Sequence, residues 1–504
     1  MNLADQLPVL PVIIPLIAAA IGILLPKGRI AWAWATLVSW VTFGVTLMLL
    51  EQVSLAETVI YDMGGWTAPL GISYRIDLIG AIVMTLVAGV AAFVFPYAKE
   101  SVAKEIPHAQ SGYFYAMMLV CFAGLMGVVA TGDAFNVFVF LEISSLSTYA
   151  LVAMGARADR RALTAAFTYL VLGTIGATFF VIGLGLLYQA TGTLNMLDLH
   201  ERLAGQDNKV VRAGFAFIVT GLGLKLAMFP LHRWLPDAYT YAPSAVTVFL
   251  ASTATKVAVY AMLRFIFTVF GFTFAFMDVA FLLFILLGLT GMVVASLVAI
   301  FRNDVKQMLA FSSVAQVGYM LLGISFATVE GVSAAVMHVF NHALMKAALF
   351  MAVGVVFYAF GSHQMSAYRG LGKRMPFTAG CFIVAGLSLI GVPFTAGFIS
   401  KYLLIEAAFS ATLAVPSLLI VFMIVASSLL AVGYIGRVAY EMFLADPAPD
   451  AAPVPKIPLS LLIPLGLMTA ANIYIGLDAE GMTGLARAGA ETLMRTGLGV
   501  GGVQ

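Results

Sequence analysis

Seven ionisable side chains interrupt long apolar stretches of this 504-residue chain. An ionised group at the centre of a membrane helix costs roughly 2.5–3.5 kcal/mol on insertion scales, and such groups usually mark ion or proton paths. The alternative is a structural ion pair that ties two helices together. A set spread over five separate apolar runs favours a path. The seven candidates are Glu142, Lys225, Lys256, His338, His342, Lys346 and Lys401.

Glu142 and Lys225 have the chemistry of a proton switch. Glu142 lies in Phe-Val-Phe-Leu-Glu-Ile-Ser-Ser and Lys225 in Gly-Leu-Gly-Leu-Lys-Leu-Ala-Met-Phe-Pro, each in the middle of an apolar run. Apolar surroundings lower the pKa of a lysine, whereas a nearby carboxylate keeps the lysine protonated. One pKa unit is about 1.4 kcal/mol, and one charge moved through 100 mV is about 2.3 kcal/mol. A Glu–Lys pair of variable separation can therefore gate proton transfer against a membrane potential.

His338, His342 and Lys346 form a polar stripe within an otherwise apolar run. Their spacing of four residues places them on one face of a helix. Histidine titrates near neutral pH and suits a proton relay. The alternative is a hydrogen-bonded contact between helices, and three aligned ionisable groups favour the relay. Lys256, with Ser252 and Thr255 nearby, is a further relay candidate.

Two of the runs that carry these residues contain helix-breaking residues. Pro230 follows Lys225 by five residues, and Gly391-Val-Pro393-Phe-Thr-Ala-Gly397 precedes Lys401. Proline frees backbone groups and can break a helix. Corresponding interruptions in two halves of a chain indicate a transporter built from repeats, with its site at the membrane midplane.

The composition requires a membrane protein to hold these residues. The chain is 62% hydrophobic and 10% charged, with a mean hydropathy of +1.03. A soluble domain is about half apolar and a quarter charged, so a soluble enzyme and a disordered tail are excluded. We predict an all-α integral membrane protein with fourteen transmembrane helices, of which the seventh and twelfth are broken. The predicted spans lie near 7–25, 31–50, 76–97, 112–130, 134–155, 162–189, 211–230, 243–267, 277–300, 307–326, 332–360, 376–406, 413–441 and 457–477.

The distribution of Lys and Arg predicts an orientation. Loops after odd-numbered spans hold fourteen of the 26 cations and the opposite side holds six. The positive-inside rule places the first group in the cytoplasm, so both termini are predicted outside. Arg264 and Arg437, within apolar runs, are close enough to helix ends to extend their charges toward the interface. A net charge of only +2 without a basic cluster excludes a nucleic-acid partner.

The sequence predicts no cofactor and no metal site. The two cysteines, Cys121 and Cys381, both lie in apolar runs, which gives no disulfide framework and no cysteine-rich metal site. A cage of carboxylates and carbonyls for a cation is not evident either.

Six motifs identify a resemblance. They begin at Thr131-Gly-Asp-Ala-Phe-Asn and continue through Glu142, Lys225-Leu-Ala-Met-Phe-Pro, Ala242-Pro-Ser to Lys256, Lys306 to Tyr319, His338-Val-Phe-Asn-His to Lys346, and Gly397-Phe-Ile-Ser-Lys401. In this order they resemble the antiporter-like membrane subunits shared by Mrp-type cation/proton antiporters, respiratory complex I and membrane-bound hydrogenases. The resemblance covers roughly residues 70–445.

The resemblance implies fourteen helices with both termini outside and two inverted five-helix repeats. It divides the chain into 1–111 with three helices, 112–270 and 271–441 with one repeat each, and 442–504 with a linker, the last helix and a short tail. It implies that Glu142 pairs with Lys225. It further implies that Lys256 and the stripe of His338, His342 and Lys346 pass protons along a hydrated axis, with Lys401 as the terminal site.

Within this family the chain most resembles the D-type subunit of the Mrp-type antiporter. Lys401 stands where one complex I branch has glutamate, and the chain is too short for the lateral helix of another branch. The variant Asp237-Ala-Tyr239 replaces the Asp-Ala-His of many relatives.

The function implied is that of a transporter subunit, not an enzyme. It would move protons within a multisubunit monovalent cation (Na⁺)/H⁺ antiporter of the plasma membrane, with other hydrophobic subunits, lipid, protons and a cation carried by the complex as its partners. Two alternatives stay open: a proton-pumping membrane-arm subunit of a redox complex, of the NADH:quinone oxidoreductase or membrane-bound hydrogenase type, and an intramembrane hydrolase. The sequence does not choose the cation or the subunit that carries it.

Overall fold

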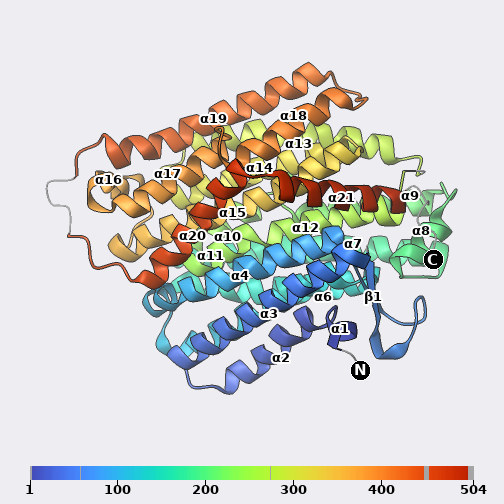
Figure 1. Cartoon of the computed structure of the whole chain (residues 1–504), viewed down its shortest axis with the longest axis horizontal. Coiled ribbons are helices and arrows are strands. Elements are labelled where there is room, and N and C mark those ends of the chain that lie inside the picture. The colour runs from blue at the N-terminus through green and yellow to red at the C-terminus, as the bar shows by residue number, and fades with distance from the viewer. Residues whose placement is uncertain (1–2, 57, 273, 448–452, 498–504) are drawn as a thin grey trace.

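Long helices lying side by side make up most of the molecule. The computed structural model describes residues 3–56, 58–272, 274–447 and 453–497. Most of the helices run along one common direction, with the N-terminal helices at one edge of the view and α18 and α19 at the opposite edge (Figure 1). One two-stranded antiparallel sheet pairs Thr58 with Asp77 and Asp62 with Ser73.

The N-terminal part packs three long helices and the hairpin. Asp77 ends the second strand and caps the following helix, because its side chain accepts a hydrogen bond from the backbone N–H of Gly80 at 3.0 Å. The elements are α1 (Leu3–Gln6), α2 (Leu10–Leu24), α3 (Arg29–Ala56), β1 (Thr58–Asp62), β2 (Ser73–Asp77) and α4 (Leu78–Glu105).

The next part contains long helices and two interrupted ones. Its elements are α5 (Ser111–Ala130), α6 (Ala134–Ala153), α7 (Arg161–Thr191), α8 (Met196–Leu203), α9 (Lys209–Lys225), α10 (Trp234–Tyr241), α11 (Ser244–Ser252), α12 (Ala254–Leu263) and the π-helix η4 (Arg264–Phe270). Short 3₁₀ helices at Met63–Gly65, His108–Gln110, Met154–Arg157 and Met365–Tyr368 connect longer elements.

The C-terminal part repeats the pattern of long and interrupted helices. Its elements are α13 (Met277–Ile300), α14 (Val305–Ser325), α15 (Val329–Phe360), α16 (Leu371–Arg374), α17 (Pro376–Ile390), α18 (Ala396–Ser410), α19 (Ser417–Phe443), α20 (Leu459–Leu477) and α21 (Glu480–Gly497).

Local features of α6 and α7 recur at α14 and α15. Asp133 caps α6 and Asp304 caps α14, each accepting from the backbone N–H three residues on. The backbone of Asp133 forms an isolated antiparallel β-bridge with Asn195, and that of Asp304 forms one with Gln364. Both α7 and α15 end at a glycine in the left-handed region, which is the usual residue there because it has no Cβ. Residues 131–241 and 302–410 thus share one order of caps, long helix and interrupted helix.

The predicted spans correspond to helices of the described residues. Eleven of these helices are long and apolar enough to cross a membrane. The predicted first span is the 15-residue α2, and the predicted breaks in the seventh and twelfth spans separate α9 from α10 and α17 from α18. The all-helical membrane fold is therefore confirmed, whereas the number fourteen stays a prediction.

Two elements differ from the sequence-based expectation. The predicted eighth span is also interrupted, because Thr253 leaves helical geometry (φ −127°, ψ −57°) between α11 and α12. Residues 480–497 form the helix α21, where we expected a tail. A guanidinium nitrogen of Arg487 in this helix lies 3.7 Å from a carboxylate oxygen of Glu330. The Gly-rich stretch after Thr496 lies largely outside the described residues.

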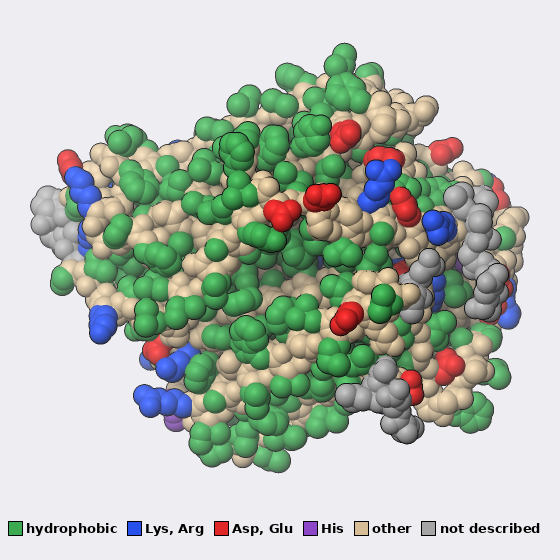
Figure 2. Space-filling model, viewed as in Figure 1, with side chains coloured by type: hydrophobic (Ala, Val, Ile, Leu, Met, Phe, Trp, Pro, Cys, Tyr) green, Lys and Arg blue, Asp and Glu red, His purple; other side chains and the backbone are tan. Residues whose placement is uncertain are grey.

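Burial separates an inner from an outer set of helices. Most residues of α4, α5, α11, α12 and α14 are buried. α3, α7, α13 and α19 instead expose many large apolar side chains. Hydrophobic side chains cover much of the face seen in Figure 2, and charged groups gather mainly toward the two ends of the helices. The predicted site residues on α12, α15 and α18 are buried and therefore belong to the inner set.

Candidate functional site

Glu142 and Lys225 form an ion pair, as predicted. The Lys225 ammonium donates to a Glu142 carboxylate oxygen at 2.9 Å and to the Ser145 hydroxyl at 2.8 Å. The Lys225 side chain is 7% exposed and that of Glu142 is 22% exposed. Glu142 and Ser145 lie on α6 and Lys225 ends α9, so the pair joins two helices through residues that are 83 positions apart in sequence.

The break in the seventh span positions Lys225 at a helix end. α9 ends at Lys225, and Ala227 takes a left-handed conformation with φ +60°. The Trp234 indole N–H donates to the carbonyl of Leu224 at 2.8 Å, which satisfies a group freed by the break. Pro230 lies in this turn, as the sequence predicted. The ammonium therefore sits where the helix ladder stops.

Lys256 also lies at a break. It is fully buried, and its ammonium donates to the Ala251 carbonyl at the end of α11. A second contact reaches the Thr255 hydroxyl at 3.3 Å. Because Thr253 interrupts the helix, the Ala251 carbonyl is available to a side chain instead of the helix ladder.

The stripe on α15 is entirely buried. His338, His342 and Lys346 are each 0% exposed. One ring nitrogen of His338 lies 2.9 Å from the Ser400 hydroxyl and the other lies 2.9 Å from the Gln316 side-chain oxygen. The imidazole rings of His338 and His342 are nearly parallel, with centroids 6.1 Å apart.

His342 and Lys346 continue the stripe with different partners. Neither ring nitrogen of His342 has a hydrogen-bonding partner among the described residues. The Lys346 ammonium donates to the Leu309 carbonyl at 2.8 Å and to the Ser312 hydroxyl at 2.5 Å. α15 packs against α14 and α18 and also touches α12, so the stripe lies between Lys256 and Lys401.

Lys401 occupies the break in the twelfth span. Its ammonium donates to the carbonyls of Leu389 and Ile390, at 3.0 and 2.9 Å, and to the Ser428 hydroxyl at 2.9 Å. The same nitrogen lies 4.8 Å from the centroid of the Tyr319 ring, which provides a cation–π contact. Lys401 thus caps the C-terminal end of α17 from the neighbouring half-helix.

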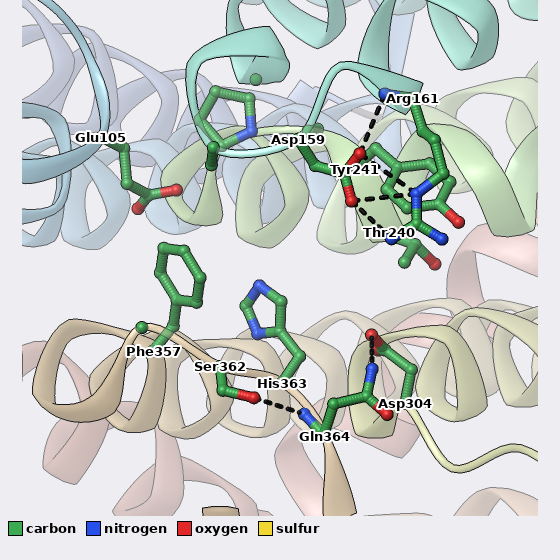
Figure 3. A pocket seen from close by; sticks show the side chains of 15 residues that line it. Glu105, Asp159, Arg161, Thr240, Tyr241, Asp304, Phe357, Ser362, His363 and Gln364 are labelled. Atoms are coloured by element: carbon green, nitrogen blue, oxygen red, sulfur yellow. Dashed lines mark hydrogen bonds and ion pairs between the residues drawn. The ribbon is translucent and has the colours of Figure 1, made fainter.

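A polar cavity of about 180 Å³ opens where five connecting segments meet. Figure 3 shows His363 and Phe357 on one side of it, facing Glu105, Asp159 and Tyr241 on the other. Asp159 is paired with Arg161, at 2.5 Å, and Gln364 donates to Asp304 at 3.2 Å. The lining includes Glu105, Asp159, Arg161, Thr240, Tyr241, Ala242, Asp304, Ser362, His363 and Gln364.

Polar contacts lead from this cavity into the inner helices. The buried Lys306 donates to the Ala242 carbonyl at 2.6 Å. Glu105 accepts from the backbone N–H of Ser244, the first residue of α11, at 2.9 Å, and from the Ser101 hydroxyl at 2.6 Å. The cavity therefore abuts the N-terminal end of α11, whose other end carries the Ala251 carbonyl bound by Lys256.

His363 of this cavity yields a pH prediction. Burial, together with the nearby Lys306, holds the pKa of His363 well below its usual range. The unfolded chain binds its proton at the ordinary pKa near 6.5, so stability should fall as the pH drops below about 6.5, by up to about 1.4 kcal/mol per pH unit. We expect His363→Gln to reduce this loss between pH 7 and 5 in thermal unfolding. Exposed His108, replaced by glutamine, is the control; equal slopes in both variants would contradict the assignment.

Asp77 and Arg264 form a second buried ion pair that the sequence did not predict. Their side chains are 1% and 7% exposed, and one guanidinium nitrogen lies 2.6 Å from the carboxylate while the other also contacts it. Arg264 further donates to the Tyr260 hydroxyl at 2.8 Å. The partner of Arg264 is a carboxylate at the start of α4, so the expectation that Arg264 extends toward the interface stays a prediction.

Glu105, Lys306 and His363 were also missing from the predicted set. Each stands at the end of an apolar run, where a charge is usually interfacial. Lys306 begins one of the six motifs, but the sequence does not show that it lies near Glu105 and His363, because these residues come from segments far apart in the chain. Among the described residues no three His, Cys, Asp or Glu side chains are placed to hold a metal ion together.

The chain is similar to known membrane proteins in sequence. Residues 131–430 match the family model described as "NADH:quinone oxidoreductase/Mrp antiporter, TM". The chain is 40% identical over 500 residues to the N-type subunit of a NADH-quinone oxidoreductase of Desulforudis audaxviator, covering 94% of this chain and 96% of that protein. It is 32% identical over 416 residues to the D-type subunit of a Na(+)/H(+) antiporter of Alkalihalophilus pseudofirmus, covering 80% and 81%.

The fold is also similar to that of a solved structure. A chain of the membrane-bound sulfane sulfur reductase, an archaeal respiratory membrane complex, superposes with a TM-score of 0.90 and 31% sequence identity, over 97% of this chain and 98% of that chain. These relatives are subunits or chains of membrane complexes. The matched segment contains Glu142, Lys225, Lys256, the α15 stripe and Lys401. The chain belongs to the NADH:quinone oxidoreductase/Mrp antiporter transmembrane family.

Proposed function

We propose that this chain is the proton-translocating subunit of a multisubunit monovalent cation/proton antiporter, embedded in the plasma membrane with both termini outside. The observation that carries the proposal is the Lys225 ammonium, bound to Glu142 at 2.9 Å at the end of an interrupted helix. A charged pair at this position can load and release a proton when its separation changes. The antiporter subunit among the relatives supports the type of complex.

The first transfer step uses the ion pair. Glu142 and Ser145 hold the protonated amine of Lys225. Movement of the carboxylate away from the amine removes the stabilising charge, and the lysine then gives its proton to the next acceptor. Lys256, on the interrupted eighth span, is that acceptor, and its own amine rests on the Ala251 carbonyl and not on a fixed counter-ion.

The later steps use the α15 stripe and Lys401. His342 has two unengaged ring nitrogens and stacks on His338, which contacts Ser400 one residue before Lys401. Imidazole can accept a proton on one nitrogen and release one from the other. Lys346 branches from the stripe toward Leu309 and Ser312. We place proton entry at the cavity of Glu105 and His363, and exchange with the other side at Lys401.

The proposed domain boundaries follow the recurring features of the fold. Three helices occupy 1–111, five-helix repeats occupy 112–270 and 271–441, and the linker and last helices occupy 442–504. The paired caps Asp133 and Asp304, and the breaks after α9 and α17, support two repeats. An odd number of spans per repeat gives the two repeats opposite orientations in the membrane. Lys225 and Lys401 then lie at the corresponding breaks of the two repeats.

A membrane-arm subunit of a redox complex is the second candidate. The 40% identity to the N-type subunit of a NADH-quinone oxidoreductase favours it. Both candidates need other hydrophobic membrane subunits, and in the antiporter the complex also carries the monovalent cation.

One experiment separates the two complexes. The native complex, purified gently through this chain, is reconstituted into liposomes with an internal pH dye, and its visible spectrum is recorded. A colourless complex that moves protons when sodium or potassium is added supports the antiporter. Flavin or iron–sulfur bands, with no response to either cation, would overturn it in favour of the redox complex.

Lys401→Gln tests the terminal site. Glutamine keeps a donor for the Leu389 and Ile390 carbonyls but cannot exchange a proton at neutral pH. A proton-transfer group typically contributes 10²–10⁴-fold, so we expect cation-driven exchange to fall at least about 100-fold in an assembled complex. Ser428→Ala, which removes one contact of the same amine, is the matched control and should stay within about threefold. Full exchange in Lys401→Gln would rule out the terminal role.

A further inference from the structure

A cavity separate from the proton path lies at one end of α2, α3 and α4. It has a volume of about 310 Å³, which lies at the lower end of the range for small-ligand sites. It is formed by the turn between α2 and α3, the C-terminal part of α4 and the start of α5. Six of the residues that line it are Gly28, Arg29, Trp32, Lys99, Glu100 and His108.

The polar groups of this cavity suit an anion. Arg29 and Lys99 supply two cations against the single carboxylate of Glu100, which lies 3.4 Å from the Lys99 ammonium. The same ammonium lies 5.2 Å from the centroid of the Trp32 ring. Lys27 adds a further cation beside the cavity, packed near Gly112 at the start of α5.

The walls of the cavity are fixed by hydrogen bonds. The backbone N–H of Gly28 donates to the Ser111 hydroxyl at 2.9 Å, and that hydroxyl donates to the His108 carbonyl at 2.8 Å. The Trp32 indole donates to the Phe95 carbonyl at 2.9 Å. Gly28 has a φ of +81°, in the left-handed region, so this turn favours glycine. The cavity is therefore a built feature and not a gap between loose loops.

Large apolar side chains stand exposed beside the cations. Ile23, Leu24 and Ile30 are 47%, 85% and 52% exposed. Figure 2 shows blue Lys and Arg side chains at the left-hand ends of these N-terminal helices, directly next to green hydrophobic surface. A free inorganic anion would use the cations alone, whereas a phospholipid would place its phosphate in the cavity and its acyl chains along these residues.

We propose that this cavity binds the phosphate headgroup of an anionic phospholipid. Basic pockets at the ends of membrane helices recognise such headgroups, each Lys or Arg contributing about a factor of five in affinity. Trp32 and Tyr115, which also line the cavity, suit the boundary between headgroup and acyl chains. The site does not depend on the direction or the driving force of proton transfer.

Lipid titration of the purified full-length complex tests the site. The probes are phosphatidylglycerol and phosphatidylcholine with identical chains, and bound lipid is counted by native mass spectrometry. We expect phosphatidylglycerol to occupy one tight site per chain. The double variant Arg29→Gln/Lys99→Gln should weaken that site about 30-fold, and Glu100→Gln, which removes the lining acid, should tighten it about fivefold.

The matched control is Lys373→Gln/Lys456→Gln, which removes two exposed lysines of the same end of the molecule outside the cavity. This control should bind phosphatidylglycerol within twofold of the unmodified chain. Equal binding of the two lipids, or unchanged affinity in Glu100→Gln, would overturn the proposal even if the double variant failed to assemble. Displacement of the lipid by an equal concentration of inorganic phosphate would identify a free-anion site and would also overturn it.

Discussion

Replacing Lys225 with alanine is expected to abolish cation-driven proton exchange while the complex still assembles. The ammonium is the only charged partner of Glu142 among the described residues, and the pair lies 2.9 Å apart at the end of α9. Without the amine, the Glu142 carboxylate has no basic partner left among the described residues with which to exchange a proton. Loss of a proton-transfer group lowers rates by 10²–10⁴-fold, so exchange should fall at least about 100-fold.

Assembly should survive because the Glu142 side chain is 22% exposed and can be hydrated when the amine is absent. Glu142→Ala should be equally inactive for the opposite reason, because an unpaired ammonium in an apolar site gives up its proton. Glu142→Gln preserves the hydrogen bond without the charge and should resemble Glu142→Ala if charge is what matters.

The measurement is the response of an internal pH dye in liposomes containing the assembled complex. Ser145→Ala is the matched control, since it removes the 2.8 Å contact to the same amine and leaves the ion pair. It should retain exchange within about fivefold. Substantial exchange in assembled Lys225→Ala complexes would disprove the proton-switch assignment.

Replacing Asp77 with alanine is expected to cost about 3–5 kcal/mol of stability, because it leaves the Arg264 guanidinium buried without its counter-charge. The substitution also removes the cap of α4. The double variant Asp77→Leu/Arg264→Met should recover most of the loss, since apolar residues of similar volume often replace a buried ion pair without penalty.

The unfolding of the detergent-solubilised complex measures this effect. Asp207→Ala is the control, because its ion pair with Arg212 is exposed and exposed ion pairs contribute little to stability. If Asp77→Ala and Asp207→Ala unfold under the same conditions, the pair between β2 and η4 does not hold these elements together.

The features that sequence analysis could locate are those carried by single residue types. Glu142 and Lys225 stand out because charge is rare in apolar runs, and the family resemblance implied that the two residues pair. The breaks near Pro230 and Pro393 were predictable because proline cannot complete a helix ladder.

Other features depend on contacts that leave no local pattern. The break at Thr253 has neither glycine nor proline beside it, so nothing in the sequence distinguishes it from a continuous helix. Asp77 and Arg264 are 187 residues apart, and Arg264 alone has the pattern of an interfacial cation. The cavity of Glu105 and His363 is assembled from five connecting segments, which only the tertiary fold brings together. The sequence analysis did not predict the helix α21, because its exposed face is charged and its average hydropathy is low.

Two of the buried lysines rest on the carboxyl ends of neighbouring half-helices. Lys256 contacts the carbonyl at the end of α11, and Lys401 contacts two carbonyls at the end of α17. A helix end carries roughly half an elementary negative charge, whereas a carboxylate carries a full one. A half charge retains a proton without trapping it, and conduction requires binding that is strong enough for entry and weak enough for departure. If the proposed function holds, the interrupted helices set how long a proton stays on Lys256 and Lys401. Lys225 differs from both, because the full charge of Glu142 holds its amine.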